Sequence, residues 1–542
     1  MRRLFNKIII LFIFTINLCF TTNIVLGAAK DVIILHTNDI HCGVEDNIGM
    51  AALAEYKNEL SKNNHVLLVD AGDAVQGAPL GKLSEGQSII NIMNAVGYDF
   101  AVPGNHEFDY GMDRFFYLAQ QLKCGYYSTN FLDANTHKNV FTPYKIFDVD
   151  GIKLAFIGAT TPETLTSSTP VYFQNENGEF KYTFCEGHAG KILYKQIQKN
   201  IDAAKQQGAE YVFLVGHLGL NGTSPYYNSA AIIHNTSGLS AVFDGHSHEQ
   251  LAGLTLKDKK GNDVIVGQTG TKLQAIGKLT LKSDGSMNYE LLRSVTAKNE
   301  NISKLITKEK AVYEPLLQAP VGKALVPLYV NDPITGKRLV RSKECSMGNF
   351  VADAYRKVLN TDVAIVNGGG IRNDLTAGIF SYNDVLKVLP FGNMGMVIEA
   401  TGQQILDALE LGAAAYPQES GAFLQVSGMS YTIDSSIPSS VKKDEKGSFI
   451  GITGPYRVKN VIIGGKKLEL DKKYTLAGSS YILRDGGNGM TMFKNARVLD
   501  DASSNETDIF IEYVQNHLNA VIGYEKAEKD KEQRIIVKQR KL

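Results

Sequence analysis

Residues 100–109 read FAVPGNHEFD, a short apolar run that ends in a Pro-Gly pair and is followed by amide, imidazole and carboxylate side chains. The same order, an apolar run, then Gly or Asp, then a residue able to bind a metal, recurs four times in the first half of the chain. Continuous apolar runs of this length predict strands buried on both faces, and helical stretches expected at 50–62 and 88–96 indicate a layered α/β fold. The four further runs are VIIL at 32–35, VLLV at 66–69, YVFLV at 211–215 and AVF at 241–243.

Seven potential metal ligands follow these five runs. In α/β sheets ligands gather beyond the carboxyl ends of the strands, so we expect the seven side chains to share one edge. Oxygen and imidazole donors without a thiolate suit Zn, Mn, Co or Fe in a hydrolytic site. Seven donors exceed the four that one tetrahedral ion needs, and with Asp73 as a bridge they match a two-metal centre. An isolated Asp-x-His or His-x-His pair is common by chance, so the prediction depends on the whole set: Asp39, His41, Asp73, Asn105, His217, His246 and His248.

Composition excludes several other classes of protein. The 542 residues are 44% apolar and 21% charged, which are values of a globular chain long enough for two large domains or three smaller ones. Lys+Arg and Asp+Glu both number 56, so no basic excess argues for a nucleic-acid-binding surface.

The N-terminus has the pattern of a secretory signal peptide. Arg2, Arg3 and Lys7 precede an apolar run at 8–20, and small residues follow at 27–29. We therefore expect residues 1–29 to be a signal peptide and the mature protein to be secreted or extracytoplasmic. An uncleaved N-terminal anchor is the alternative; no other long apolar segment predicts a stable membrane anchor after cleavage.

Four cysteines lie outside this segment: Cys42, Cys124, Cys185 and Cys345. Their wide spacing leaves two readings open, two disulfides in one of three pairings or isolated thiols packed as small apolar side chains. Neither reading gives them a role in metal binding or catalysis.

The strand-end motifs, taken in order, resemble those of the calcineurin-like metallophosphatase superfamily, and the variant at 105–109 resembles the secreted 5′-nucleotidase and UDP-sugar hydrolase family. Three motifs in the second half agree: ECSMGN at 344–349, NGGGIR at 367–372 and LPFG at 389–392. The resemblance covers nearly all of the chain after residue 30. It implies a dimetal catalytic domain of sheets flanked by helices at 30–300, a connector helix within 301–325, and a mixed α/β substrate-binding domain at 326–542.

The resemblance also implies roles for single residues. It assigns Asp39, His41, Asp73 and His248 to one metal site, and Asp73, Asn105, His217 and His246 to the other. His106 and Asp109 match the catalytic dyad. The cofactors implied are two divalent ions, with Zn, Mn or Co favoured. The expected substrate-binding residues are Arg341, Asn367, Arg372, Phe391, Tyr481 and Asn488.

Two positions depart from the family pattern. Asn488 stands where relatives carry an Asp that binds the ribose hydroxyls, so the partner offered to the sugar is neutral here. A second stacking aromatic would fall at Ile482, with Tyr481 beside it. Either Tyr481 serves through a one-residue shift or Phe391 forms a one-sided clamp.

The function implied is that of an exported metal-dependent phosphoesterase that hydrolyses nucleoside 5′-phosphates to nucleosides and phosphate through a metal-activated water. Alternatives are a 2′,3′-cyclic-nucleotide phosphodiesterase with 3′-nucleotidase activity, and a hydrolase of UDP-sugars or nucleoside polyphosphates. A non-catalytic surface binding protein is a more remote alternative, since a decayed enzyme would be expected to lose ligand residues. The partner is a small-molecule nucleotide, and the oligomeric state is left open.

Overall fold

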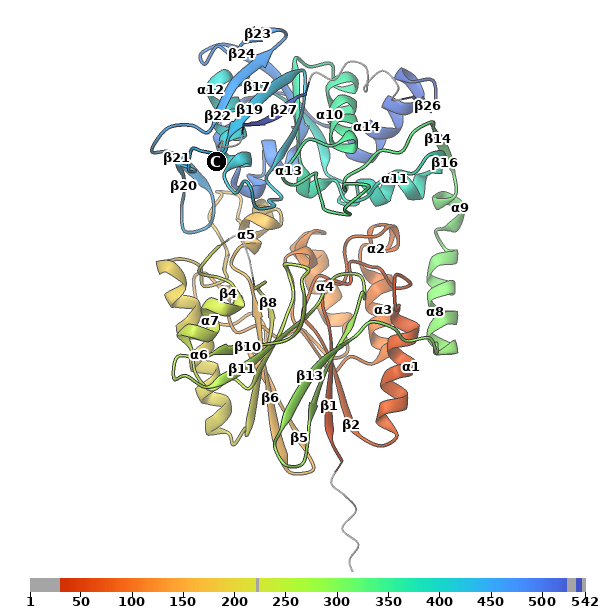
Figure 1. The fold of residues 1–542 in the computed structure, drawn as a ribbon, viewed down its shortest axis with the longest axis vertical. Coiled ribbons are helices and arrows are strands. Elements are labelled where there is room, and N and C mark those ends of the chain that lie inside the picture. Colours follow the sequence, from red (N-terminus) through yellow and green to blue (C-terminus); the bar gives the residue numbers. More distant parts are fainter. Residues whose placement is uncertain (1–29, 221–223, 524–532, 539–542) are drawn as a thin grey trace, which may run out of the picture.

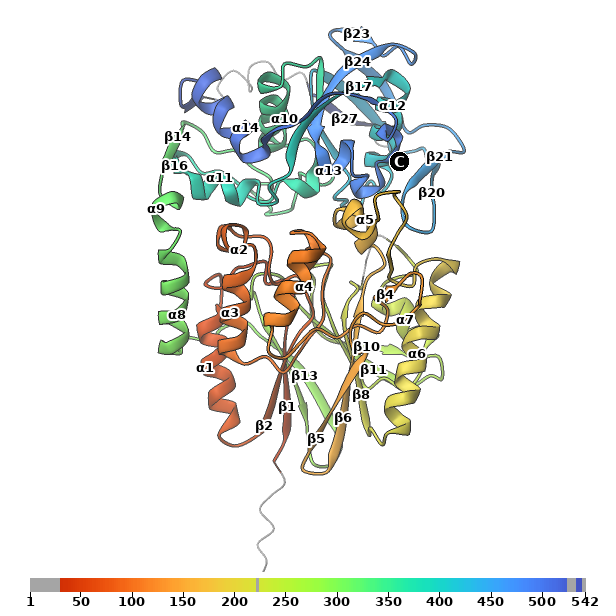
Figure 2. The ribbon, with the colours of Figure 1, turned by 180° about the vertical axis from the view of Figure 1, so that it is seen from behind.

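The computed structural model describes residues 30–220, 224–523 and 533–538, so the predicted signal peptide lies outside the described residues. The chain folds into two domains, one above the other in Figure 1, and helix α8 (Glu300–Ala311) lies along one side of the lower, N-terminal domain and leads toward the upper one. Figure 2 shows the same arrangement from behind.

The N-terminal domain contains two sheets packed face to face, with strand orders β13-β12-β1-β2-β3 and β10-β11-β9-β8-β6-β5. The first sheet comprises β1 (Val32–Thr37), β2 (His65–Asp70), β3 (Phe100–Ala101), β12 (Ile276–Leu281) and β13 (Met287–Leu292). The second comprises β5 (Tyr144–Val149), β6 (Ile152–Thr160), β8 (Tyr211–His217), β9 (Ala241–Asp244), β10 (Gln250–Lys257) and β11 (Asp263–Thr269).

Burial on both faces explains the continuous apolar runs. In β1, Ile34 packs into the core between the two sheets, while Ile33 and Leu35 pack into the core beneath the helices. Alternate side chains of a strand point to opposite faces, so every residue of such a run must be apolar. The predicted layered α/β fold is confirmed.

Helices cover the outer faces of both sheets (Figures 1 and 2). The predicted helical stretches at 50–62 and 88–96 are α1 and α3. A small two-stranded sheet is formed by β4 (Leu132–Asp133) and β7 (Tyr182–Thr183). The helices of this domain are α1 (Met50–Ser61), α2 (Pro79–Ser84), α3 (Gln87–Val96), α4 (Met112–Gln121), α5 (Thr164–Ser167), α6 (Lys191–Gln206) and α7 (Ser229–Asn235).

The connector expected within 301–325 is two helical segments, not a single helix. Helix α8 ends at Ala311, and a separate turn, α9 (Glu314–Leu317), follows. Pro315 explains the break, because its ring clashes with the carbonyl four residues earlier and it has no N–H to donate. The chain then enters β14 (Pro320–Ala324), which already belongs to a sheet of the C-terminal domain.

The C-terminal domain is built on a five-stranded sheet of order β18-β15-β24-β17-β25, with an apolar core on each face. Smaller sheets have the orders β16-β14-β26 and β23-β22-β19-β27, and β20 pairs with β21. The remaining strands are β15 (Val363–Asn367), β16 (Gly378–Ser381), β17 (Met394–Thr401), β18 (Leu424–Ser427), β19 (Met429–Asp434), β20 (Val441–Lys443), β21 (Phe449–Ile452), β22 (Val458–Ile463), β23 (Lys466–Lys467), β24 (Lys473–Ser479), β25 (Arg497–Asn505), β26 (Val521–Ile522) and β27 (Ile535–Lys538). The helices are α10 (Ser346–Val358), α11 (Tyr382–Val388), α12 (Gly402–Ala413), α13 (Ser480–Leu483) and α14 (Glu506–Glu512).

Each large apolar core is made of residues from one domain, whereas polar contacts join the domains. Gln76 donates a hydrogen bond to the Pro390 carbonyl (3.4 Å), and Lys446, in the hairpin of β20 and β21, forms an ion pair with Glu186.

Cys42, Cys124, Cys185 and Cys345 are free thiols. Within the described ranges, no helix is both long enough and apolar enough to span a membrane.

Candidate active site

The predicted metal ligands lie together at the end of the N-terminal domain that faces the C-terminal domain. Five of the seven, Asp39, His41, Asp73, His246 and His248, have φ between 46° and 75°. Non-glycine residues rarely adopt this left-handed conformation, and it concentrates at functional sites, where the surrounding fold compensates its strain. This conformation produces tight turns in the loops after β1, β2 and β9, and these turns direct the five side chains toward one point.

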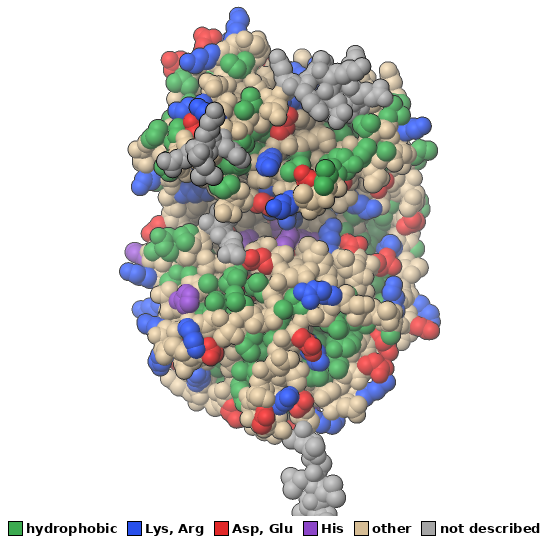
Figure 3. Space-filling model, in the orientation of Figure 1, with side chains coloured by type: hydrophobic (Ala, Val, Ile, Leu, Met, Phe, Trp, Pro, Cys, Tyr) green, Lys and Arg blue, Asp and Glu red, His purple; other side chains and the backbone are tan. Residues whose placement is uncertain are grey.

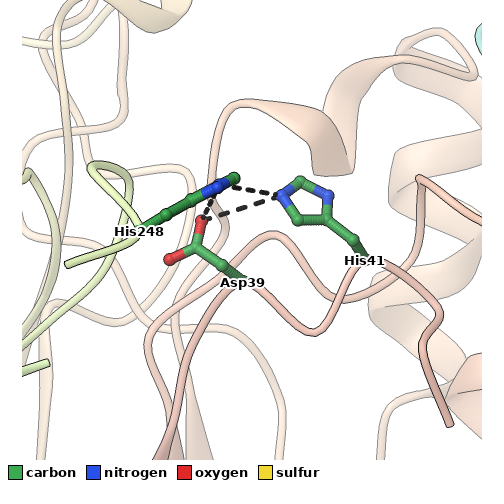
Figure 4. A group of neighbouring side chains, drawn as sticks. All are labelled: Asp39, His41 and His248. Carbon is green, nitrogen blue, oxygen red and sulfur yellow. Dashed lines mark hydrogen bonds and ion pairs between the residues drawn. The ribbon is translucent and has the colours of Figure 1, made fainter. Parts of the chain in front are cut away.

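The first cluster contains Asp39, His41 and His248 (Figure 4). Nε2 of His41 lies 3.2 Å from Nε2 of His248, and Oδ1 of Asp39 lies 3.2 Å from the same His248 nitrogen. The other ring nitrogen of His41, Nδ1, donates to the Gln76 carbonyl (3.0 Å), which fixes the orientation of the ring.

The second cluster contains Asp73, His217 and Asn105. Nε2 of His217 lies 3.2 Å from both Oδ2 of Asp73 and Oδ1 of Asn105, while its Nδ1 donates to the Ala71 carbonyl (2.7 Å). Oδ2 of Asp73 is also 3.8 Å from Nε2 of His41. The Asp73 carboxylate therefore lies between the two clusters.

His246 is held from two sides. Its backbone N–H donates to Oδ2 of Asp39 (2.9 Å), and its Nε2 lies 3.1 Å from Oε2 of Glu163. Its ring packs edge-on against the ring of His217, with centroids 5.0 Å apart. The contact with Glu163 leaves Nδ1 as the ring nitrogen available to a metal.

The donor set fits divalent cations. Oδ1 of Asp39 is buried and accepts no hydrogen bond from any described residue, so it fits the role of a ligand to a cation. At metal–nitrogen distances of 2.0–2.1 Å, two tetrahedral ligands lie about 3.3 Å apart, close to the spacing of the His41 and His248 nitrogens. Burial alone would raise the pKa of Asp39, but His248 and His217 outweigh this and lower it to about 2, so the group is a carboxylate.

Glu107 joins the two loops that carry Asp73 and Asn105. Its buried carboxylate accepts hydrogen bonds from the backbone N–H groups of Asp73 (2.8 Å), Ala74 (2.7 Å) and Gly104 (2.6 Å). Glu107 belongs to the FAVPGNHEFD motif, but no role is predicted for it from the sequence. Its position directly after the dyad residue His106 was the sequence signal that could have predicted a role for it.

The predicted dyad forms a short hydrogen bond. Nδ1 of His106 lies 2.5 Å from Oδ2 of Asp109, and both side chains are nearly buried. Burial disfavours the imidazolium, but Asp109 and Asp73 outweigh it and raise the pKa of His106 above its usual value. The backbone N–H of His106 donates to Oδ1 of Asp73 (2.8 Å), which ties the dyad to the metal-ligand clusters.

A cleft of about 800 Å³ separates the two domains at this point. Figure 3 shows it as a hollow across the middle of the molecule, with histidine and Lys/Arg side chains inside. The predicted ligands Asp39, His41 and His217 are buried beneath its floor. The other predicted site residues line it: Asp73, Asn105, His106, Asp109, His246, His248, Arg341, Asn367, Arg372, Phe391, Tyr481 and Asn488.

Guanidinium groups dominate the C-terminal wall of the cleft. Arg338, Arg341 and Arg372 lie close enough that burial and the charge of Arg338 lower the pKa of Arg372 to about 10. Glu419 pairs with Arg338 (3.3 Å). Three cations facing the ligand clusters form a wall suited to an anionic substrate. Arg338, three residues before Arg341, was missed because a lone Arg in a polar loop has no motif.

Phe391 meets the catalytic domain directly. Its ring centroid lies 5.4 Å from that of His106, and the Arg372 guanidinium lies 5.2 Å from the centre of the same ring. An aromatic ring thus lies on the C-terminal wall beside the dyad.

The structure shows where the residues at the two departures from the family pattern lie. Ile482 is fully buried in the core, whereas Tyr481 lines the cleft. The Tyr481 hydroxyl donates to the Thr166 carbonyl of the other domain (3.0 Å) and accepts from the Asn488 N–H (3.2 Å). Asn488 adopts a left-handed φ of 54°, which Asn tolerates better than most residues, and its Nδ2 donates to the Gly421 carbonyl (3.3 Å).

Comparisons with known proteins agree with this architecture. The model of the calcineurin-like phosphoesterase family matches residues 32–250, and that of the 5′-nucleotidase C-terminal domain matches residues 320–495. A 5′-nucleotidase of Vibrio cholerae is 29% identical over 525 residues, which cover 86% of this chain and 89% of the relative. A 5′-nucleotidase of Vibrio parahaemolyticus is 27% identical over 530 residues, 89% of each chain.

A solved structure shows the same fold. The 5′-nucleotidase precursor from Thermus thermophilus superposes with a TM-score of 0.78 at 24% identity, covering 94% of this chain and 99% of the other. The two family models match in order and together cover well over half of the residues. The chain therefore joins a calcineurin-like phosphoesterase domain to a 5′-nucleotidase C-terminal domain, and it is similar to 5′-nucleotidases over most of its length.

Proposed function

We propose that this metallophosphoesterase hydrolyses nucleoside 5′-phosphates to nucleosides and phosphate. The observation that carries the proposal is the composition of the two cleft walls. The dyad and the ligand clusters occupy one wall, and three guanidinium groups with a half-buried aromatic ring occupy the other. A substrate spanning them needs an anionic group at one end and a flat apolar group at the other, which describes a nucleotide.

We assign one ion to Asp39, His41, Asp73 and His248, and a second to Asp73, Asn105, His217 and His246, with Zn, Mn or Co as the metals. Two such ions would polarise a water molecule for attack and neutralise charge on the phosphoryl group.

The residues of the chain supply the remaining chemistry. His106, held as an imidazolium by Asp109, donates a hydrogen bond to the phosphoryl or leaving oxygen as negative charge develops there. Arg341 and Arg372 bind the phosphate or ribose oxygens from the opposite wall, and Phe391 stacks on the base. Asn367, Tyr481 and Asn488 complete the nucleoside side of the cleft.

We further propose that the protein is exported. The basic and apolar pattern of residues 1–29 supports this location, and N-terminal sequencing of the protein from its native host tests it.

A substrate panel after metal reconstitution tests the function. Phosphate release should be fastest with nucleoside 5′-monophosphates. The panel includes 3′-monophosphates, 2′,3′-cyclic nucleotides, UDP-sugars and nucleoside triphosphates. Faster turnover of any of these would replace the proposed substrate class, and no turnover of any phosphoester would contradict the enzymatic assignment.

Removing the Phe391 ring separates base recognition from chemistry. Phe391→Ala should raise KM for nucleotides, because base stacking contributes about 1–3 kcal/mol, roughly 5- to 150-fold in affinity. p-Nitrophenyl phosphate, which has no base, should be affected much less. The measurement is kcat/KM for both substrates in the wild type, Phe391→Ala and the ring-retaining control Phe391→Tyr. Equal losses on both substrates would show that Phe391 supports the fold and not the base.

A further inference from the structure

Residues 163–168 form a six-residue segment after β6. This segment contacts a predicted metal ligand, the predicted catalytic dyad and the C-terminal domain. We propose that this 163–168 segment is a positioning element. In it, Glu163 orients the ring of His246 and Ser168 orients the carboxylate of Asp109. The carbonyl of Thr166 accepts a hydrogen bond from Tyr481 and so connects the segment to the C-terminal domain. The inference rests on the proposed function, because it concerns how the assigned groups are aligned for phosphate ester hydrolysis. Figures 1 and 2 both place α5, the centre of the segment, at the boundary between the domains.

Glu163 fixes the imidazole of His246. Oε2 of Glu163 lies 3.1 Å from Nε2 of His246, and Oε1 accepts a hydrogen bond from the backbone N–H of Ser224. With both oxygens engaged, the carboxylate has little freedom to rotate. Metal-binding histidines usually donate their second ring N–H to such an acceptor, which sets both the tautomer and the plane of the ring.

Ser168 fixes the carboxylate of Asp109 in the same way. Ser168 is 1% exposed, and its hydroxyl donates to Oδ1 of Asp109 (2.9 Å). The other oxygen of Asp109, Oδ2, accepts from Nδ1 of His106. The two oxygens of Asp109 are thus held by different groups. The plane of the carboxylate, and with it the direction in which His106 points, depends on the serine.

The segment is one hydrogen-bonded turn. Thr166 N–H and Ser167 N–H donate to the Glu163 carbonyl, and Ser168 N–H donates to the Thr164 carbonyl, at 2.8–3.1 Å. A shift of any part of so short a turn moves Glu163 and Ser168 together. The Tyr481 hydroxyl binds this turn at the Thr166 carbonyl, so the position of the C-terminal domain is transmitted to both contacts.

Double-mutant cycles test whether Ser168 acts through Asp109. Ser168→Ala should lower kcat roughly 10- to 100-fold, the usual effect of removing an outer partner, with metal content and KM unchanged. In an Asp109→Asn background the same substitution should cause little further loss, because its target is already impaired. An equal loss in both backgrounds would overturn the assignment. If the alanine variant does not fold, Ser168→Cys, with its weaker donor, enters the same cycle.

Metal content tests Glu163. Glu163→Ala should weaken metal binding roughly 10- to 100-fold, so that added metal restores activity. The metal affinity of Glu163→Gln should lie between that of Glu163→Ala and that of the wild type. Unchanged metal affinity in Glu163→Ala would overturn this part of the proposal.

The hydroxyl of Tyr481 tests the contact between domains. Tyr481→Phe keeps the ring but should lower kcat for nucleotides and for p-nitrophenyl phosphate alike, because the domain contact to the 163–168 segment is lost. A loss confined to nucleotides would assign Tyr481 to substrate binding alone.

Thr164→Val is the matched control within the same turn. The Thr164 hydroxyl is buried and has no hydrogen-bond partner among the described residues, so its removal should leave kcat, KM and metal content unchanged. If Thr164→Val reduced activity as strongly as Ser168→Ala, the segment would have only a structural role. A wild-type enzyme that released no phosphate would refute the proposed function itself, whereas an active wild type with normal Glu163→Ala and Ser168→Ala variants would refute only this inference.

Discussion

Asp73→Ala is expected to abolish phosphate release and to lower metal content at both sites. Oδ2 of Asp73 lies 3.2 Å from Nε2 of His217 and 3.8 Å from Nε2 of His41, so one carboxylate serves both clusters. Its Oδ1 also accepts the backbone N–H of His106, and its loss would release the dyad loop as well.

Metal analysis of purified variants, together with phosphate release, makes the comparison. His41→Ala should empty mainly one site, because its Nε2 belongs to the first cluster. His65→Ala is the control, since His65 begins β2 and pairs with Asp150 (2.7 Å), away from the clusters. Two ions still bound per chain in Asp73→Ala would show that Asp73 does not bridge them.

His106→Ala is expected to keep both ions and to lose roughly 10²- to 10⁴-fold in kcat, the usual contribution of a positioned acid–base group. Metal binding should survive because the His106 ring hydrogen-bonds Asp109 and only packs edge-on against the ligand His41, with centroids 5.4 Å apart. Its link to Asp73 is made by the backbone N–H, which alanine retains. Asp109→Asn should follow the same pattern with a smaller loss, since the imidazole remains but is less strongly held as a cation.

Steady-state kinetics and metal content, measured on the same preparations, separate the possible outcomes. A loss of one ion in His106→Ala would reassign the histidine as a ligand. A small kcat effect with full metal occupancy would mean that protonation of the leaving group depends on another residue.

The sequence could predict those parts of the site that follow from strand topology. Strands buried on both faces produce runs such as 32–35 and 66–69, and a parallel strand must end at the same edge as its neighbours. The residue after such a run is therefore placed in space by its position in the chain. Asp39 and Asp73 could be brought together in this way without any knowledge of the loops. His217 ends β8 of the second sheet, so its approach to them depends on how the two sheets pack.

Other features depend on geometry that the local sequence does not encode. Glu163 follows the buried strand β6 but lies three residues past its end, in a turn whose direction decides what it meets. Ser168 and Tyr481 acquire their roles only when two distant segments pack together. Pro315 could have predicted the break between α8 and α9, because proline is disfavoured inside a helix.

The separation of the apolar cores also determines how the molecule loses its structure. The cores beneath α1 and α6 contain N-terminal residues, and those around β15 contain C-terminal residues, while the interface is held by polar contacts such as Gln76 with Pro390. We therefore expect the two domains to unfold in separate transitions, which one free energy of unfolding would not describe. A substitution that unfolds one domain should then leave the other folded, so that activity is lost while the secondary structure of the intact domain persists.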